Sequence, residues 1–198
     1  MFTGIVRGIG LIVQTEIKNS ILRYAVLFPS ELLSGLTRGA SVSVDGVCQT
    51  VVMIDQDQIW FEAIGETLER TTLKEMSKGK SVNLERAAHF GDEIGGHLLS
   101  GHIFGTASII SIDHNIYSLL GSAEWMKYLF SKGYIAIDGI SLTLVDVDTI
   151  NKKFTVHLIP ETLAHTTLGQ KKPGDFVNIE IDSLTQAAVD TVSRLLHV

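Results

Sequence analysis

The sequence predicts an all-β protein made of two tandem small barrels related by internal duplication, followed by a C-terminal α-helix. Four blocks of the first half recur in the same order in the second half. Within each half, short apolar runs alternate with polar residues and end at turn-forming residues, as strands do. The last segment has helical spacing and no counterpart in the repeat.

The repeated blocks lie about 95 residues apart, and so many ordered matches at nearly one spacing indicate duplication. They are Gly4-Ile5-Val6 with Gly101-His102-Ile103, Asp45-Gly46 with Asp138-Gly139, Glu66-Thr67-Leu68 with Glu161-Thr162-Leu163, and Gly79 with Gly174. We therefore expect a first barrel over 1–97, a second over 98–182 and a helix over 183–198. The seam falls within the Gly-rich stretch 91–101.

Strand patterns occupy matching places in the two halves. Residues 41–44 alternate polar and apolar, as a half-buried strand should. Residues 59–61 and 154–158 are β-branched and aromatic runs that follow polar turns. Short strands at such spacing favour a closed barrel, which leaves few open sheet edges.

Helical signals are few before the C-terminus. Residues 66–73 and 161–168 suit one short helical turn or a loop each, and 123–130 has helix-forming residues before Gly133. Ser183 and Gln186 resemble a capping box, and an apolar stripe follows it. A helix of about fourteen residues is marginal alone in water, so its apolar face must dock on its own barrel or between subunits.

Composition excludes several classes of protein. Hydrophobic residues make up 45% and charged residues 19%, which favours a folded core over disorder. The net charge of −6, with scattered basic residues, argues against a nucleic-acid surface. No apolar run approaches the ~20 residues of a membrane span, and the N-terminus lacks the layout of a secretion signal. The single Cys48 excludes an internal disulfide, and we expect a cytoplasmic protein.

The two Asp-Gly blocks carry the clearest chemical difference between the halves. The first continues to the thiol of Cys48, and the second continues to the hydroxyl of Ser141. Cys48 is a nucleophile, a substrate contact or a buried small hydrophobe; no protease signature surrounds it. Thr50 and Thr143 follow at matching places and suit a ligand rich in hydroxyl and amide-like groups.

The seam contains two histidines but no recognisable cofactor motif. His97 and His102 lack the further ligands that a metal site needs, so we predict none. The glycines form neither a Walker loop nor a dinucleotide fingerprint. His102 replaces Ile5 of the first copy, so it is either a site residue or a hydrogen-bonded surface histidine.

Several motifs together resemble the riboflavin synthase family of the alpha-chain type. They are Met1-Phe2-Thr3-Gly4-Ile5-Val6, Ser100-Gly101-His102, Asp138-Gly139-Ile140-Ser141-Leu142-Thr143 and Ile159-Pro160-Glu161-Thr162-Leu163. The resemblance runs from Met1 to about Leu196 and keeps both repeats in register.

The resemblance implies two six-stranded Greek-key barrels and a C-terminal helix, assembled as a homotrimer. It implies that two 6,7-dimethyl-8-ribityllumazine molecules exchange a four-carbon unit, giving riboflavin and 5-amino-6-ribitylaminouracil, with no cofactor. The productive site would lie between the first barrel of one subunit and the second barrel of another. Holding two lumazines face to face contributes ~7–11 kcal/mol to lowering such a barrier. An association with lumazine synthase is a further expectation.

The resemblance also implies the residues of each pocket. The first pocket would hold Gly4, Ile5, Val6, Ser41, Cys48, Gln49, Thr50, Glu62, Ala63, Ile64, Gly65, Glu66 and Thr67. The second would hold Gly101, His102, Ile103, Ser141, Leu142, Thr143, His157, Leu158, Ile159, Pro160, Glu161 and Thr162. Lys132 matches a family lysine that reaches the partner subunit's site.

For mechanism, we hypothesise that His102 transfers the proton from the C7 methyl of one lumazine. Ser141, Thr143 and Asp138 would orient groups or relay protons, and Cys48 would contact the acceptor lumazine. A lumazine- or flavin-carrying antenna protein without catalysis is the alternative. The presence of all five of these polar residues favours the enzyme.

Overall fold

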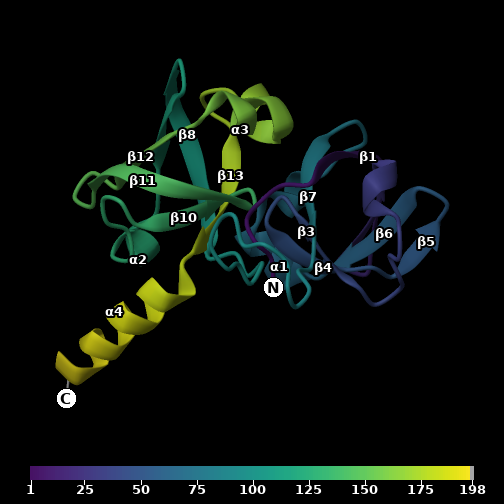
Figure 1. Ribbon diagram of the computed structural model, residues 1–198, viewed down its shortest axis with the longest axis horizontal. Coiled ribbons are helices and arrows are strands. Elements are labelled where there is room, and N and C mark those ends of the chain that lie inside the picture. The colour runs from purple at the N-terminus through teal and green to yellow at the C-terminus, as the bar shows by residue number, and fades with distance from the viewer. Residues whose placement is uncertain (197–198) are drawn as a thin grey trace.

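The computed structural model describes residues 1–196 as two β units and a C-terminal helix (Figure 1). The first unit contains β1 (Gly8–Lys18), β2 (Ile21–Leu27), β3 (Ser41–Val44), β4 (Val47–Thr50), β5 (Met53–Asp55), β6 (Gln58–Ala63) and β7 (Ser81–Arg86). The second contains β8 (Gly105–Asp113), β9 (Ile116–Leu120), β10 (Tyr134–Ile137), β11 (Ile140–Asp148), β12 (Lys153–His157) and β13 (Phe176–Ile181).

The second unit is the closed six-stranded barrel that the family resemblance implies. Its strands pair around the ring in the order β10-β11-β12-β9-β8-β13. Its apolar side chains, among them Trp125, Phe154 and Ile179, form one buried core. The irregular register of β11 between Leu144 and Val147 bends that strand without breaking it.

The first unit follows the same cyclic order but is an open sheet of seven strands, β4-β3-β7-β1-β2-β6-β5. The two edge strands, β4 and β5, are consecutive in the chain and together occupy the place of β11. Between them, Val51 donates its N–H to Ala40 and Val52 donates to Trp60 across the gap. The break between β4 and β5 therefore falls at the place where β11 has an irregular register. The connecting residues between β4 and β5 span this break. The sheet encloses a second core that contains Tyr24, Phe61 and Leu84.

The two units meet through hydrogen bonds that are reciprocal, as expected of duplicated parts related by a local two-fold axis. Asn83 Nδ2 donates to Asp138 O at 3.0 Å, and Asn178 Nδ2 donates to Asp45 O at 2.8 Å. In return, Asn83 Oδ1 accepts from Thr167 N and Asn178 Oδ1 accepts from Thr72 N, each at 2.8 Å. Both asparagines are 2% exposed or less, so the units are fixed against each other by buried polar contacts.

The Asp-Gly turns of the two units pack back to back at this axis. Gly46 and Gly139 have φ values of +83° and +80°, which other residues rarely adopt. A Cβ added to Gly46 would lie 2.6 Å from Gly139 N, so neither turn tolerates a side chain there. The residues that follow these turns, Cys48 and Ser141, are thereby held at fixed places on the two units.

Short helices lie at matching places of the two copies, between the last two strands of each unit. The predicted helical turns are α1 (Gly65–Arg70) and α3 (Pro160–His165), each followed by a 3₁₀ turn at Thr72–Glu75 or Thr167–Gln170. Thr71 and Thr166 cap these 3₁₀ turns by accepting from Leu73 N and Leu168 N. A further 3₁₀ turn covers Ser30–Leu32, and α2 (Ala123–Met126) is shorter than the predicted helix.

The C-terminal helix α4 (Ser183–Leu196) points away from the β units (Figure 1). Asp182, rather than the expected Ser183, caps it, because its carboxylate accepts from the N–H and hydroxyl of Thr185. Tyr128 Oη donates to Asp190 at 2.7 Å and ties the helix to its own barrel. Among residues 1–196, no helix is long and apolar enough to cross a membrane.

Candidate active site

The segments that precede each barrel are exchanged between the two units. Ser141 N donates to Gly4 O at 2.8 Å, so the N-terminal segment lies on the second barrel. Cys48 N donates to Gly101 O at 2.8 Å, so the connecting segment lies on the first barrel. In agreement, Val6 packs against the second core and Ile103 against the first.

This exchange corrects the predicted grouping of residues into pockets. Gly4, Ile5 and Val6 lie with Ser141, not with Cys48, and Gly101, His102 and Ile103 lie with Cys48, not with Ser141. The physical reason is that the chain crosses the local axis before it enters each barrel. Arg7 N then donates to Leu84 O and Phe104 N donates to Ile179 O, which returns each segment to its own barrel.

Two buried glutamates hold the crossing segments in place. Glu85 accepts from Thr3 N at 2.6 Å, Thr3 Oγ1 at 2.7 Å and Gly4 N at 3.1 Å. Glu180 accepts from Ser100 N, Ser100 Oγ and Gly101 N at 2.6, 2.7 and 3.0 Å. Burial raises the pKa of both carboxyls, although these hydrogen bonds and the nearby Arg7 or His102 oppose the shift.

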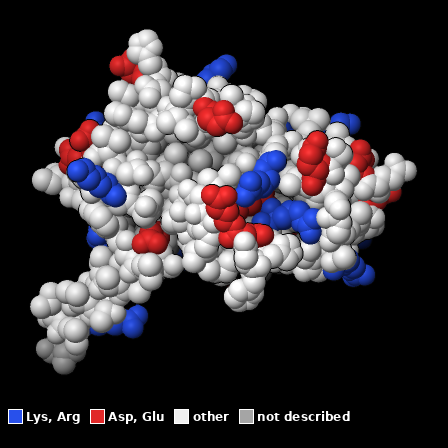
Figure 2. Space-filling view, viewed as in Figure 1, with Lys and Arg blue, Asp and Glu red and all other residues white. Residues whose placement is uncertain are grey.

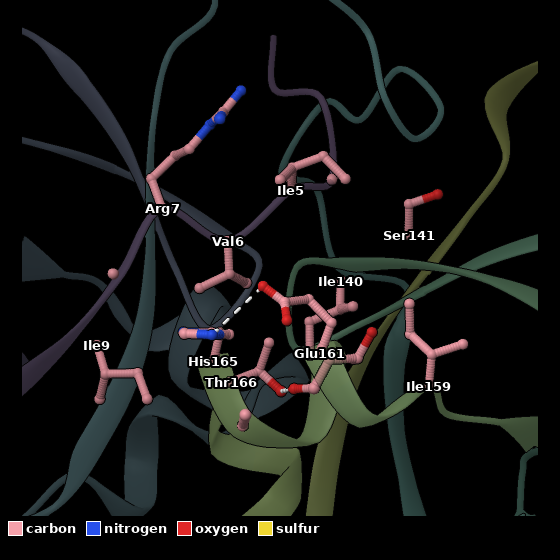
Figure 3. Close-up of a pocket in the computed structure, with 14 residues that line it drawn as sticks. Ile5, Val6, Arg7, Ile9, Ile140, Ser141, Ile159, Glu161, His165 and Thr166 are labelled. Carbon is pink, nitrogen blue, oxygen red and sulfur yellow. Dashed lines mark hydrogen bonds and ion pairs between the residues drawn. The ribbon is translucent and has the colours of Figure 1, made fainter.

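A cavity of about 490 Å³ opens between the N-terminal segment and the second barrel (Figure 3). Gly4, Ile5 and Val6 form one wall, while Ser141, Ile159, Glu161 and Thr162 form the other. The cavity also takes in Arg7, Ile9, Ile140, Ala164, His165 and Thr166, which the sequence did not single out. Its apolar walls and few polar groups suit a flat heterocycle with a polar side chain, and its volume is typical of a small-molecule site.

His97, rather than His102, contacts the hydroxyl of Ser141. Its Nδ1 lies 2.6 Å from Ser141 Oγ, and its ring stacks on Tyr134 at a centroid distance of 5.1 Å. His97 Nε2 is buried without a hydrogen-bond partner among residues 1–196. Burial lowers the pKa of His97, so the ring is neutral near pH 7 and is able to accept from or donate to Ser141.

The first barrel presents the matching constellation around Cys48. Cys48 is half-buried, and Thr50 is exposed on the same outer face of β4. Ser41 pairs with Thr50 across β3 and β4. His102, an exposed residue, is held at this side by its N–H, which donates to Ser100 Oγ at 3.1 Å.

Strand alternation divides the predicted binding residues into two sets. Side chains at alternate positions of a strand point to opposite faces. Cys48, Thr50, Glu62, Ile64, Ser141, Thr143, His157 and Ile159 are partly or fully exposed, whereas Gln49, Ala63, Leu142 and Leu158 are buried in the barrels. Gln49 Oε1 accepts from Tyr24 Oη inside the first core. The side chains of the inward set are buried in the barrels, so a ligand would contact these residues through their backbone.

Asp138 does not reach the cavity. It is 0% exposed, its Oδ1 accepts from Asn178 N at 2.7 Å, and its Oδ2 lies 3.2 Å from Lys171 Nζ. Burial raises the pKa of Asp138, while Lys171 opposes the shift. Burial and the neighbouring Asp138 raise the pKa of Asp45 to about 7. These carboxyls belong to the contact between the units, where Asp138 positions the turn that carries Ser141.

The remaining predicted residues lie at the starts of the short helices, some of them in the cavity wall, and in the turn before β10. Gly65, Glu66 and Thr67 open α1, and Pro160, Glu161 and Thr162 open α3. Lys132 is exposed in the turn before β10, with φ +67°, and does not line the cavity. Within the described residues, no group of three or more His, Cys, Asp or Glu side chains could hold a metal ion.

Comparison with known proteins identifies the family. The lumazine binding domain model matches residues 3–87 and again residues 100–182. Riboflavin synthase from Chlamydia pneumoniae is 50% identical over 196 residues, covering 99% of this chain and 97% of the relative. Riboflavin synthase from Escherichia coli is 48% identical over 201 residues, covering 99% and 93%.

The chain belongs to the riboflavin synthase family. As a member of it, the chain is an enzyme, and its two halves are lumazine-binding repeats. Among solved structures, LumP in complex with riboflavin superposes with a TM-score of 0.83 at 27% identity, over 92% of this chain and 100% of LumP. LumP in complex with 6,7-dimethyl-8-(1'-D-ribityl) lumazine gives a TM-score of 0.82 at 26% identity over the same shares.

Proposed function

We propose that this enzyme carries out a dismutation of two 6,7-dimethyl-8-ribityllumazine molecules. One molecule gives a four-carbon unit to the other, so that the products are riboflavin and 5-amino-6-ribitylaminouracil, and no external oxidant or reductant is consumed. The observation that carries the proposal is the reciprocal exchange of segments. This exchange supports two similar but chemically distinct sites for two copies of one substrate.

The two constellations suit different parts of this reaction. One lumazine loses a proton from its C7 methyl, which the ring acidifies, and we assign this proton transfer to His102. Cys48, on the same face, contacts the acceptor lumazine. Ser141, with His97 and the nearby Thr143, orients the molecule in the second-barrel cavity. Asp138 acts through the backbone of its turn.

We further propose that the active enzyme is a cytoplasmic homotrimer. The cavity is open, and Ile64 and Ile159 at equivalent places are 58% and 63% exposed, which supports closure of each site by a facing barrel. Lys132 would then reach the partner subunit's site. An association with lumazine synthase stays a prediction, which copurification from cells that contain both proteins would test.

One assay tests the function. Purified protein is mixed with ribityllumazine and no cofactor, and the absorbance of riboflavin is followed over time. Riboflavin should exceed the protein in moles and reach half of the lumazine consumed. A single coloured ligand retained per chain without conversion would instead identify an antenna protein, the alternative that the likeness to LumP favours.

A further inference from the structure

The same ion pair occurs in both halves, with arginine as its cation in the first half and histidine in the second. On α1, Arg70 Nε lies 3.7 Å from Glu66 Oε1, and on α3, His165 Nε2 lies 3.3 Å from Glu161 Oε1. Each cation follows its glutamate by four residues, which places the two side chains on one helical face. Position 70 of the first copy therefore corresponds to position 165 of the second, with arginine in one and histidine in the other.

The histidine lies at the proposed ligand site. Both Glu161 and His165 line the cavity, and Figure 3 shows the Glu161 side chain directed towards the imidazole beneath Val6. Arg7 is the other charged residue of the cavity lining, and it also lies near Glu85, whose carboxyl it influences. His97 faces the cavity only through Ser141. Glu161 is thus the acidic group of the lining, and His165 is its ion-pair partner.

A held carboxylate binds hydroxyl groups better than a mobile one, because less side-chain freedom is lost when the ligand arrives. A protonated imidazole holds Glu161 by charge, whereas a neutral imidazole does not. Histidine ordinarily changes charge between pH 5 and 8, while arginine stays charged throughout that range. The two sites should therefore respond differently to pH.

We propose that His165 is a positioning residue for Glu161, and that it makes the second-barrel site bind ribityl ligands more weakly as the imidazole loses its proton. The first-barrel site, which has Arg70 at the same place, keeps its affinity over the same range. This inference rests on the proposed function, because it takes the polyhydroxylated chain of the ligand as the group that Glu161 contacts. Since these side chains are mostly exposed, the effect is about two- to fivefold in affinity.

The experiment uses riboflavin, which does not turn over alone, and measures its affinity by fluorescence quenching from pH 5.5 to 8.0. Wild type should show one site that weakens about two- to fivefold across this range. His165→Arg should remove that component, and Arg70→His should impose it on the other site. His165→Ala should bind at pH 5.5 as wild type does at pH 8.0. Other titrating groups, such as His97 and Asp45, remain in all of these proteins and cancel in the comparison.

Two results would overturn the inference. One is a His165→Arg profile that matches wild type, and the other is an Arg70→His variant with no added pH dependence. Both leave the proposed function standing if the proteins still convert lumazine. Loss of lumazine conversion and of riboflavin binding in wild type at every pH would instead count against the proposed function. Both substitutions are at exposed positions, and the thermal midpoint of each variant verifies that it is folded.

Discussion

At the scale of single residues, Cys48 and Ser141 occupy equivalent positions of the two copies but differ in chemistry. Each follows an Asp-Gly turn, faces outward from its strand and donates its N–H to a crossing segment. Among residues 1–196, Ser141 but not Cys48 contacts a buried histidine, His97, which comes from the connecting segment. The two sites therefore share a backbone frame but differ in the acidity and proton-accepting ability of their side chains.

Replacing His102 with Gln tests the assignment of proton transfer. General acid-base catalysis contributes ~10²–10⁴-fold, so we expect kcat for lumazine conversion to fall by about 10²-fold with little change in KM. His114→Gln, on the exposed turn between β8 and β9, serves as the control. Full turnover of His102→Gln at saturating lumazine would remove His102 from the mechanism.

Cys48→Ser tests whether the thiol contacts the acceptor lumazine. Exchanging a polarizable sulfur for a smaller, better-hydrated oxygen should lower kcat/KM about fivefold, which corresponds to ~1 kcal/mol. Steady-state rates over a range of lumazine concentrations measure this. Kinetics equal to wild type would make Cys48 a packing residue only.

Gly46→Ala tests the close contact between the two Asp-Gly turns. Both Gly46 and Gly35 have positive φ, so alanine at either should cost about 1–2 kcal/mol of unfolding free energy. An added Cβ meets nothing within 4 Å at Gly35 but lies 2.6 Å from Gly139 N at Gly46. Urea unfolding should therefore show Gly46→Ala to be less stable than Gly35→Ala by roughly 2 kcal/mol or more. Equal costs would mean that the turns separate readily.

At the scale of elements, the period of each strand explains both what the sequence predicted and what it missed. Polar and apolar alternation located β3, and β-branched and aromatic runs located β6 and β12. The repeated segments 66–73 and 161–168, expected as a helical turn or a loop, cover most of the short helices α1 and α3. A family resemblance carries whole segments, so it included Gln49 and Leu142 although β4 and β11 turn them inward. Applying strand alternation to those segments would have separated the outward-facing side chains from the inward-facing ones.

The crossing of the segments could not be read from the repeat. The same four matched blocks are compatible with each segment lying on its own barrel or on the other one. Contacts between residues distant in sequence determine on which barrel each segment lies. The main ones are Glu85 with Thr3 and Glu180 with Ser100, which hold the backbone where it crosses. For the same reason His97, an unmatched residue of the connecting segment, gave no signal that it would meet Ser141.

Helix α4 presents an apolar surface that its own barrel leaves uncovered. Val189 packs against the second core, but Leu184, Val192 and Leu195 are 81%, 56% and 71% exposed. Figure 2 shows this helix as a mostly uncharged projection, while charged groups are dispersed over the rest of that face. The sequence left open whether the apolar face of the helix docks on its own barrel or between subunits. The barrel covers only part of that face.

Charge on this stripe should separate subunits. Val192→Asp combined with Leu195→Asp places two carboxylates on the exposed apolar face, and we expect the mass in solution to fall to that of one chain. Lumazine conversion should fall with it, because each proposed site needs a facing barrel. Arg194→Glu, which changes charge beside the apolar stripe rather than on it, is the control. Light scattering after size exclusion measures the masses, and an unchanged mass in the double variant would contradict the assignment.

At the scale of the whole molecule, two buried carboxyls share one buried ammonium at the contact between the units. Asp138 Oδ2 lies 3.2 Å from Lys171 Nζ, and Asp138 lies close enough to Asp45 for its charge to disfavour ionisation of Asp45. Position 171 corresponds to Met76 of the first copy, so duplication gave the pair one cation rather than two. Burial lowers the pKa of Lys171, but the two carboxylates outweigh this and raise it.

This arrangement predicts how stability depends on pH. Burial and Asp138 raise the pKa of Asp45 to about 7, whereas an unfolded Asp titrates near ~3.9. At a pH between these two pKa values, Asp45 is protonated in the folded protein but ionised in the unfolded chain. The free energy of unfolding must therefore fall as pH rises through this window, and the stabilisation is lost above pH ~7.

Asp45→Asn removes this titration and keeps an oxygen that can accept from Asn83 N. The unfolding free energy of the variant minus that of wild type should increase from pH 5 to pH 8, by up to about 3 kcal/mol. Asp113→Asn, at an exposed site with 82% of its side chain accessible, should show no such increase. Urea unfolding at each pH measures both. A difference that stays constant with pH would show that Asp45 is ionised throughout, with the charge of Lys171 sufficient for both carboxylates.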